Sequence, residues 1–311
     1  MPAGQLPGTG GINRGEKEKE RETCVIRKIK IIFEMIKFEH TIFALPFAYM
    51  GMILGSFEIN GSWPTLSQWI WVTVAMFGAR SAAMSLNRLI DATIDRRNPR
   101  TAERAIPAGL ISYLEIIAFI VVSFVLFFTA AFQLNMLAVY LLPIAVFFLT
   151  FYSYTKRFTW LCHFILGMTI AIAPLGGWVG ATGGLHPESF LLFLAVMFWT
   201  AGFDIIYATQ DVEHDKSVGL YSVPARFGVK RALQTARGSH VVSIVALFSL
   251  FFLSELGVVY LIGACISTAI MIYEHSLVSE SDLSNVNVAF FTMNGIVSMV
   301  MLAFTIGDFI L

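Results

Sequence analysis

The chain has 311 residues, of which 57% are hydrophobic and only 14% are charged, and its formal net charge is zero. Soluble domains typically have about 45–50% apolar and about 25% charged residues, so this composition excludes an ordinary soluble protein and indicates one that faces a lipid bilayer. The zero net charge by itself indicates nothing about partners, and we expect no nucleic-acid partner and find none implied among proteins. The three cysteines, Cys24, Cys162 and Cys265, lack the spacing of a zinc site or a disulfide framework.

The first 23 residues differ from the rest, because they are rich in glycine and charged residues and contain no apolar core like that of a signal peptide. We therefore expect residues 1–23 to form an uncleaved and disordered polar tail. Residues 24–311 are expected to form a single transmembrane domain.

Apolar stretches long enough to cross a bilayer, about 20 residues each, recur from Phe38 to the C-terminus. The sequence predicts an all-α polytopic membrane protein in which about nine transmembrane helices form a bundle. The predicted spans are residues 35–57, 66–90, 111–132, 134–154, 160–182, 189–210, 231–253, 256–275 and 286–311.

The positions of lysine and arginine orient this bundle. Basic residues precede the first span, follow the second at residues 88–104, separate the fourth and fifth as Lys156 and Arg157, and follow the sixth at residues 216–237. With nine spans, these loops all lie on one side, which the positive-inside rule makes cytoplasmic. We expect a multi-pass protein of the cell membrane with its N-terminus in the cytoplasm and its C-terminus outside.

An acidic motif ends the second predicted span. Asn87, Asp91 and Asp95 recur every four residues, so a helix places them on one face, where like charges repel each other and do not stabilise the helix. A divalent cation explains the arrangement, because Mg²⁺ takes hard oxygen ligands from one or two carboxylates together with substrate phosphates.

A second acidic motif, with Asp211 and Asp215 again four residues apart, ends the sixth predicted span. Acids placed at a helix end for solubility would account for one such motif. Two matched motifs at the cytoplasmic ends of helices two and six favour a functional site, since ionisable groups at membrane depth are rare. Basic residues around both motifs indicate a receptor for diphosphate, although any single arginine fits a lipid headgroup equally well.

The two motifs also suggest an internal repeat. A shift of 124 residues places Asn87 on Asp211, Asp91 on Asp215 and Arg80 on Asp204. We predict parallel repeats at about residues 35–155 and 160–277, followed by a last helix, with the site at their interface. Arg80 and Asp204 each lie about two helical turns before their motif. We hypothesise either that they pair across the interface or that Arg80 binds a substrate directly.

These residues resemble the motifs of the intramembrane aromatic prenyltransferases, the UbiA superfamily. Its Asn-x-x-x-Asp-x-x-x-Asp motif is similar to the run from Asn87 to Asp95, and its Asp-x-x-x-Asp motif to the run from Asp211 to Asp215. An Arg-Ser-Ala run at residues 80–82, an Arg-x-x-Pro-x-Gly run at 104–109 and the Lys-Arg pair at 156–157 extend the likeness, which covers residues 35–311. One departure is Arg88 after Asn87, where the hydroxybenzoate enzymes often have aspartate.

The resemblance implies a Mg²⁺-dependent enzyme that transfers a polyprenyl group from prenyl diphosphate to the ring of a small aromatic acceptor, with 4-hydroxybenzoate as the first choice, in ubiquinone or menaquinone biosynthesis. It implies a set of catalytic carboxylates that hold Mg²⁺ together with Asn87, namely Asp91, Asp95, Asp211 and Asp215. The implied diphosphate-binding residues are Arg88, Arg104, Lys156, Arg157 and Lys216. The residues implied for the acceptor or the allylic cation are Arg80, Tyr152, Tyr154, Asp204 and Tyr207. Each tyrosine fits an interfacial aromatic belt equally well.

Two alternatives remain. A prenyltransferase of the same kind could use a naphthoate or a glycerophosphate-type acceptor. A secondary transporter could use the carboxylates as ion sites, but transporters place such acids near the bilayer midplane, whereas here they lie at span ends.

The predicted orientation can be tested by cysteine labelling of intact cells, with the native cysteines removed. A cysteine introduced at Asn60 should react with an impermeant thiol reagent added outside, because residue 60 follows the first span, whereas one introduced at Asn98 should not. The reverse labelling pattern would place the acidic motifs outside the cell and contradict the orientation.

Overall fold

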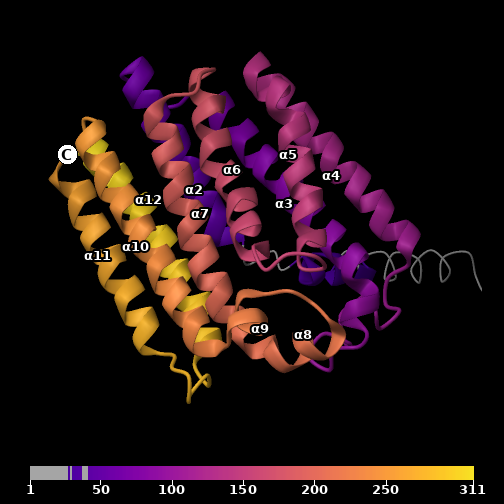
Figure 1. Cartoon of the computed structure of the whole chain (residues 1–311). Helices are drawn as coiled ribbons and strands as arrows, with labels where there is room; N and C mark the ends of the chain where they lie inside the picture. Colours follow the sequence, from indigo (N-terminus) through magenta and orange to yellow (C-terminus); the bar gives the residue numbers. More distant parts are fainter. Residues whose placement is uncertain (1–26, 29, 37–40) are drawn as a thin grey trace, which may run out of the picture.

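A computed structural model describes residues 27–28, 30–36 and 41–311 of the chain. Within these residues every regular element is a helix and none is a strand, which confirms the predicted all-α class (Figure 1). The elements are α2 (Thr41–Asn60), α3 (Leu66–Asp95), α4 (Tyr113–Leu134), α5 (Met136–Thr155), α6 (Cys162–Thr182), α7 (Pro187–Ala208), the 3₁₀ turn η2 (Thr209–Asp211), α8 (Val212–Val218), α9 (Val223–Phe227), α10 (Val229–Leu253), α11 (Val258–Ser276), the π-helical η3 (Val288–Met293) and α12 (Asn294–Ile310). The predicted polar tail at residues 1–23 lies outside the described residues.

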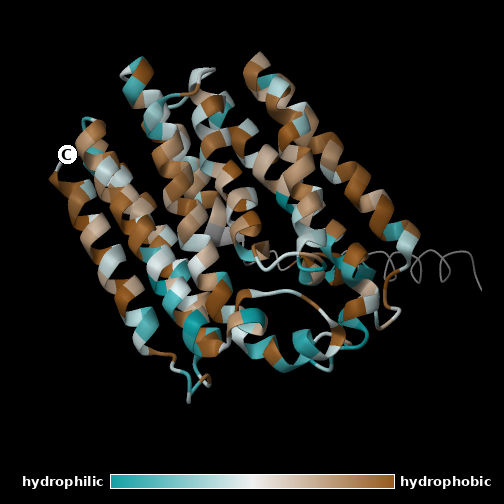
Figure 2. Ribbon diagram, viewed as in Figure 1, coloured by the Kyte–Doolittle hydropathy of each residue, from teal (hydrophilic) through white to brown (hydrophobic). Residues whose placement is uncertain are grey.

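The long helices lie side by side in one bundle, and the short helices α8 and α9 lie at one of its ends (Figure 1). α2 packs along α6, α3 along α4, and α7 along both α6 and α10. Hydrophobic residues cover most of the long helices, whereas hydrophilic residues gather on α8, α9 and the adjoining helix ends (Figure 2). The bundle therefore has one distinctly polar end, which is the end that carries both acidic motifs.

Seven of the helices in the described part of the chain are long and apolar enough to cross a membrane. They begin at Tyr113, Met136, Cys162, Pro187, Val229, Val258 and Val288. α2 and α3, which contain most of the first two predicted spans, are not among them, and α3 is the more polar because its second half carries Arg80 and the first acidic motif. The chain is thus a multi-pass membrane protein, and the count of nine spans stays a prediction.

Polar side chains at the helix starts explain where several helices begin. Ser112 and Glu115 form a capping box at the start of α4, in which each side chain accepts a backbone N–H of the other residue. Asn135 ends α4 and caps α5 by accepting the N–H of Ala138 over 3.0 Å. Its amide also donates to the carbonyl oxygen of Val179 on α6 over 2.7 Å. One residue therefore sets a helix boundary and the position of a neighbouring helix.

The largest buried side chains are the two tryptophans Trp178 on α6 and Trp199 on α7, with exposed fractions of 0% and 1%. Trp199 contacts the ring of Phe47 on α2 at a centroid distance of 5.0 Å and that of Phe203 at 4.9 Å. Such rings bury a large apolar area, so the core lies where α2, α6 and α7 meet.

Two glycines allow the backbones of α2 and α6 to touch. A Cβ atom on Gly51 would lie 2.1 Å from the carbonyl oxygen of Pro174, and one on Gly177 would lie 2.0 Å from the carbonyl oxygen of Ala48. Contacts this short are impossible, so neither position can hold a side chain unless the helices separate. Close approach through small residues is a common basis of helix association in membranes.

Replacement of Gly177 by alanine should lower the stability of the folded protein. The added methyl group must push α6 away from the α2 backbone, and overpacking of this kind typically costs about 1–3 kcal/mol. Thermal unfolding in detergent, followed by circular dichroism, measures the effect.

The neighbouring Gly176 supplies a matched control, because a Cβ atom there meets nothing within 4 Å. Gly176→Ala should leave the melting temperature unchanged or slightly raised, since alanine favours a helix over glycine by about 1 kcal/mol. Equal melting temperatures for the two variants would contradict the backbone contact.

Candidate functional site

The first acidic motif lies on one face at the C-terminal end of α3, as predicted. Asp91 and Asp95 are buried, with exposed fractions of 1% and 4%. The side-chain amide of Asn87 donates to Oδ2 of Asp91 over 3.0 Å and to the hydroxyl of Ser153 on α5 over 3.3 Å. Two buried carboxylates one turn apart must be neutralised, because an unpaired charge at this depth is costly.

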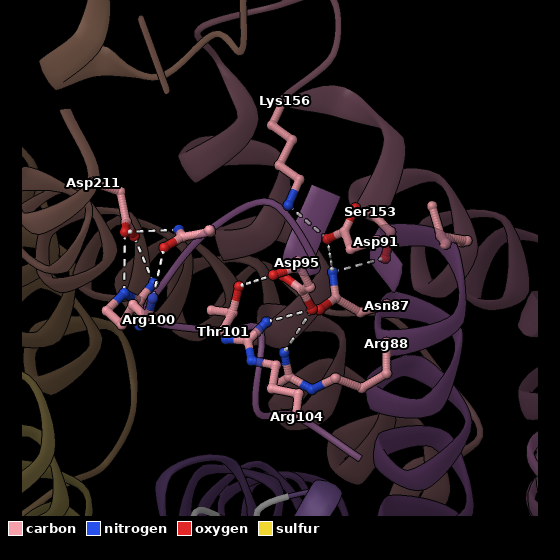
Figure 3. A network of polar contacts seen from close by, with 12 residues as sticks. Asn87, Arg88, Asp91, Asp95, Arg100, Thr101, Arg104, Ser153, Lys156 and Asp211 are labelled. Carbon is pink, nitrogen blue, oxygen red and sulfur yellow. Dashed lines mark hydrogen bonds and ion pairs between the residues drawn. The ribbon is translucent and has the colours of Figure 1, made fainter. Parts of the chain in front are cut away.

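The Lys-Arg pair that follows α5 neutralises Asp91, and Figure 3 shows the lysine of this pair beside the carboxylate. Lys156 Nζ is 2.6 Å from Oδ2 of Asp91, and Arg157 Nη2 is 2.9 Å from Oδ1. Arg157 also donates to the carbonyl oxygens of Ser153 and Ile90, at 2.7 and 2.9 Å. These bonds hold the α5–α6 connection against the end of α3.

Two arginines neutralise Asp95, the next acid of the first motif (Figure 3). Arg104 Nη1 lies 2.7 Å from Oδ2 of Asp95, and Arg88 Nη1 lies 4.0 Å from the same oxygen. The hydroxyl of Thr101 donates to the carbonyl oxygen of Asp95 over 2.9 Å. The loop after α3 therefore turns back onto the motif that precedes it.

The second acidic motif does not lie on one continuous helix. α7 ends at Ala208, a 3₁₀ turn carries Asp211, and α8 carries Asp215. The four-residue spacing of Asp211 and Asp215 therefore spans a 3₁₀ turn and the helix that follows it. The carboxylate of Asp215 accepts the hydroxyl of Ser222 over 2.9 Å.

Arg100 joins the two motifs, because it comes from the loop after the first motif and binds the second (Figure 3). Its Nε and Nη2 atoms donate to the two carboxylate oxygens of Asp211 over 3.0 and 2.6 Å. Asn98 donates to the same carboxylate over 3.4 Å. Burial lowers the pKa of Arg100, but the hydrogen bonds and charge of Asp211 outweigh burial and raise the pKa above its ordinary value.

Tyr207 and Tyr154 each contact one of these arginines. The hydroxyl of Tyr207 accepts Nη1 of Arg100 over 3.0 Å, and its ring lies 4.1 Å from the ring of Phe290 in η3. The guanidinium of Arg157 lies 5.4 Å from the centroid of the Tyr154 ring. Both tyrosines therefore border the charged cluster, with Tyr154 on its exposed side.

Lys216 lies apart from the other predicted diphosphate-binding cations. Its side chain is half exposed, and its ammonium group lies 3.8 Å from Glu213. The structure brings together Arg88, Arg104, Lys156 and Arg157 with the first motif, but Lys216 stays on the outer face of α8.

An apolar cavity of about 220 Å³ is lined by side chains of α2 to α6. Its polar lining side chains are Arg80, Tyr152 and Thr169. The hydroxyl of Tyr152 donates to the carbonyl oxygen of Ala83 on α3 over 3.1 Å. Nε of Arg80 is buried and has no hydrogen-bond partner among the described residues. The cavity therefore combines an apolar wall with one buried cation, on the same two helices, α3 and α5, that lead to Asp91 and Lys156.

The hypothesis that Arg80 pairs with Asp204 is wrong. Within the described part of the chain, the side-chain partner of Asp204 is His163 on α6, whose Nδ1 atom lies 2.6 Å from Oδ2 of Asp204. The reason is the helix order, because α7 packs against α6 and α10 whereas α3 packs mainly against α4. Arg80 lines the cavity instead.

Several polar contacts were not anticipated from the sequence, namely those of Asn98, Arg100, His163 and Ser222. Arg100 carried a signal, since it belongs to a run of cations between the two motifs. His163 carried none, because a lone histidine at a helix start is usually a satisfied structural residue. Among the described residues, no group of three or more His, Cys, Asp or Glu side chains is close enough to hold one metal ion.

Comparison with known proteins gives consistent matches over most of the chain. Residues 44–296 match the family model described as the UbiA prenyltransferase family. A protein of Aliivibrio fischeri named 4-hydroxybenzoate octaprenyltransferase is 28% identical over 256 residues, which cover 78% of this chain and 89% of that protein.

Solved structures match the fold as well. The apo structure of a UbiA homologue from Aeropyrum pernix K1 is 32% identical, with a TM-score of 0.79, and the match covers 87% of this chain and 98% of that one. A UbiA homologue from Archaeoglobus fulgidus, bound to DMAPP and Mg²⁺, is 19% identical with a TM-score of 0.71, and the match covers 90% of this chain and 99% of that one. At that identity the second likeness concerns the fold alone.

Replacement of Asp91 by asparagine should destabilise the protein. The neutral amide leaves Lys156 and Arg157 without their buried counter-charge, and the expected loss is about 1–3 kcal/mol because both cations are partly exposed to solvent. Thermal unfolding at low ionic strength measures it.

Glu213→Gln is the matched control, since Glu213 pairs with Lys216 on the surface and its side chain is 92% exposed. Its melting temperature should equal that of the unaltered protein. A melting temperature of Asp91→Asn that is equally unchanged would mean that the ion pairs do not hold the α5–α6 connection.

Proposed function

The chain belongs to the UbiA prenyltransferase family and is a prenyltransferase of the membrane, and we propose that it transfers a polyprenyl group from prenyl diphosphate to the ring of 4-hydroxybenzoate. The observation that carries this proposal is the junction of a charged cluster with an apolar cavity. The cluster contains both acidic motifs and their cations, and the cavity runs along α3 and α5 beside it. Prenyl diphosphate has the same two parts, a diphosphate head and an apolar chain.

The cations of the first motif suit the diphosphate head. Arg104, Lys156 and Arg157 form ion pairs with Asp91 or Asp95, yet their side chains keep about 30% of their surface exposed. In the proposed complex they turn from the carboxylates to the diphosphate oxygens, which carry a larger negative charge and accept charge-assisted hydrogen bonds as carboxylates do. Arg88, 4.0 Å from Asp95, completes this set, and the exposed Lys216 would contribute only if α8 moved.

The carboxylates suit Mg²⁺, because the donor set consists of hard oxygen atoms. Asp91, Asp95, Asp211 and Asp215 would hold the ions, with Asn87 as a neutral ligand. Magnesium is usually bound by one or two carboxylates plus substrate phosphates, so a prenyltransferase needs no preformed cage of three acids. When bound, Mg²⁺ would neutralise the charge that develops on the departing diphosphate. The Archaeoglobus fulgidus homologue with this fold binds DMAPP and Mg²⁺.

The reaction replaces one bond by another. The bond between the allylic carbon and the diphosphate oxygen breaks, a ring carbon of the acceptor bonds to the allylic carbon, and the ring loses a proton. The protein must hold the allylic carbon and the ring carbon of the acceptor close together, and it must keep water away from the allylic cation. Tyr152 at the cavity wall can offer its ring face to that cation, whereas Tyr207 and Tyr154 contact arginines.

Arg80 is the residue we propose for the acceptor. It lines the cavity and its Nε atom is buried without a partner, so a benzoate carboxylate would satisfy its guanidinium through paired hydrogen bonds. A naphthoate acceptor also has a carboxylate and remains the nearest alternative. Asp204 is excluded from direct acceptor binding in this proposal, because His163 occupies it.

Purified protein in detergent should convert one prenyl diphosphate and 4-hydroxybenzoate into the prenylated acid, detected by mass spectrometry. No gradient exists in detergent, so a product also excludes a transporter. Chelation should abolish the reaction and added Mg²⁺ should restore it. Asp215→Asn should lose most of the rate, because it removes a charged ligand.

A panel of acceptors identifies the second substrate. The product should form with 4-hydroxybenzoate and fail with 4-hydroxybenzamide, which lacks the charge that Arg80 would bind. If the enzyme prefers a dihydroxynaphthoate or a glycerophosphate, the proposed acceptor is wrong but the protein is still a prenyltransferase. Turnover of the amide equal to that of the acid would remove Arg80 from the acceptor site.

A further inference from the structure

A buried histidine outside the charged cluster contacts the segment that adjoins the second acidic motif. His163 is the second residue of α6 and is 4% exposed. Its Nδ1 atom lies 2.6 Å from Oδ2 of Asp204 on α7, and its Nε2 atom accepts the backbone N–H of Val223, at the start of α9, over 3.3 Å. The ring therefore links three helices, α6, α7 and α9.

The partner of Nε2 determines where the ring proton lies. A backbone N–H can only donate, so Nε2 must be the unprotonated nitrogen. The proton is then on Nδ1, where it points to the carboxylate of Asp204. His163 thus donates to one helix and accepts from another, which no apolar side chain of similar size can do.

Ser222, the residue before Val223, connects the segment that His163 holds to the second acidic motif. Its hydroxyl donates to Oδ2 of Asp215 over 2.9 Å and accepts the N–H of Ala225 over 3.2 Å, as the N-cap of α9. The hydroxyl thus both donates and accepts a hydrogen bond. Its position at the start of α9 therefore sets the position of the Asp215 carboxylate.

Tyr221 connects the same segment to the first motif. Its N–H donates to the carbonyl oxygen of Lys156 over 2.7 Å, and its carbonyl oxygen accepts Sγ of Cys162 over 3.4 Å. Lys156 in turn binds Asp91. The segment Tyr221–Val223 is therefore hydrogen-bonded at one end to the backbone of Lys156 and at the other end to His163. The hydrogen bond from Ser222 to Asp215 lies between these two contacts.

We propose that His163 is a positioning residue, which holds Val223 and, through Ser222, fixes the Asp215 carboxylate relative to Lys156 and the first motif. This inference rests on the proposed function, in which Asp215 is a metal ligand. Residues that orient a ligand typically change metal affinity by about 10–100-fold when they are replaced. His163 itself touches neither substrate nor metal in this proposal.

A second buried histidine provides the control. His240 on α10 is 2% exposed, and its ring nitrogens also have two partners, the carbonyl oxygen of Trp199 at 3.2 Å and His275 at 3.0 Å. None of these partners belongs to either motif or to the segment Tyr221–Val223. His240→Leu therefore reproduces the loss of a buried, doubly bonded imidazole away from the site.

The first measurement is the binding of Mn²⁺, as a paramagnetic substitute for Mg²⁺, in the presence of unreactive geranyl thiodiphosphate, by electron paramagnetic resonance. His163→Leu should weaken Mn²⁺ binding about 10-fold or more. His163→Gln, whose amide both donates and accepts, should recover part of the affinity, and His240→Leu should leave it unchanged. Unaltered affinity in folded His163→Leu would overturn the proposal.

Ser222 keeps the test decisive if the His163 variants do not fold. Ser222→Ala should weaken Mn²⁺ binding to a similar extent, whereas Ser222→Thr, which keeps the hydroxyl, should not. Equal affinities for these two variants would also overturn the proposal, because the link to Asp215 would then have no effect.

Hydrogen–deuterium exchange separates this inference from the proposed function, since it needs neither metal nor substrate. Amides of residues 219–225 should exchange faster in His163→Leu than in His240→Leu. Equal exchange would reject His163 as the anchor even if the enzyme is a prenyltransferase. If the unaltered protein binds no Mn²⁺ with geranyl thiodiphosphate, the proposed function fails, and exchange alone decides whether His163 holds the segment.

Discussion

Four carboxylates lie at one end of this membrane bundle, and the cations that neutralise three of them, Asp91, Asp95 and Asp211, organise the polar end of the protein. These cations come from two connections between helices, so the ion pairs also fix two loops: Lys156 and Arg157 fix the α5–α6 connection, and Arg104 and Arg100 fix the loop after α3. Pairs of this kind are tolerated in a low dielectric where single charges are not. The same cations can change partners when an anion and a divalent cation arrive together, because the divalent cation then takes their place beside the carboxylates.

The features that depend on short-range periodicity could be predicted from the sequence. The common face of Asn87, Asp91 and Asp95 follows from the helical repeat alone, and all three residues lie in α3, where Asn87 donates to Asp91. The nearness of Lys156 and Arg157 to this face was inferred from the resemblance and from the side of the membrane assigned to each loop. The all-helical class follows from composition and the length of the apolar stretches. Each of these inferences needs only the local sequence or the order of the spans.

The choice among partners could not be predicted, because it depends on how the helices pack. Asp204 had Arg80 as a plausible partner by the repeat, yet α6 lies against α7 and brings His163 to it. Arg100 was one of several cations in its loop, and only the path of that loop selects it for Asp211. The 3₁₀ turn at the end of α7 likewise has no clear signal, since the residues around it would also suit a continuous helix.

The backbone contact between α2 and α6 has a consequence for the order in which the protein is built. α6 is synthesised only after α3, α4 and α5, so the face of α2 that carries Gly51 is made before its partner exists. Gly177 later packs against this face, and the contact determines the distance between α2 and α6. The close contact between these two helices can therefore form only after the three intervening helices have been made, and the two glycines act at that step.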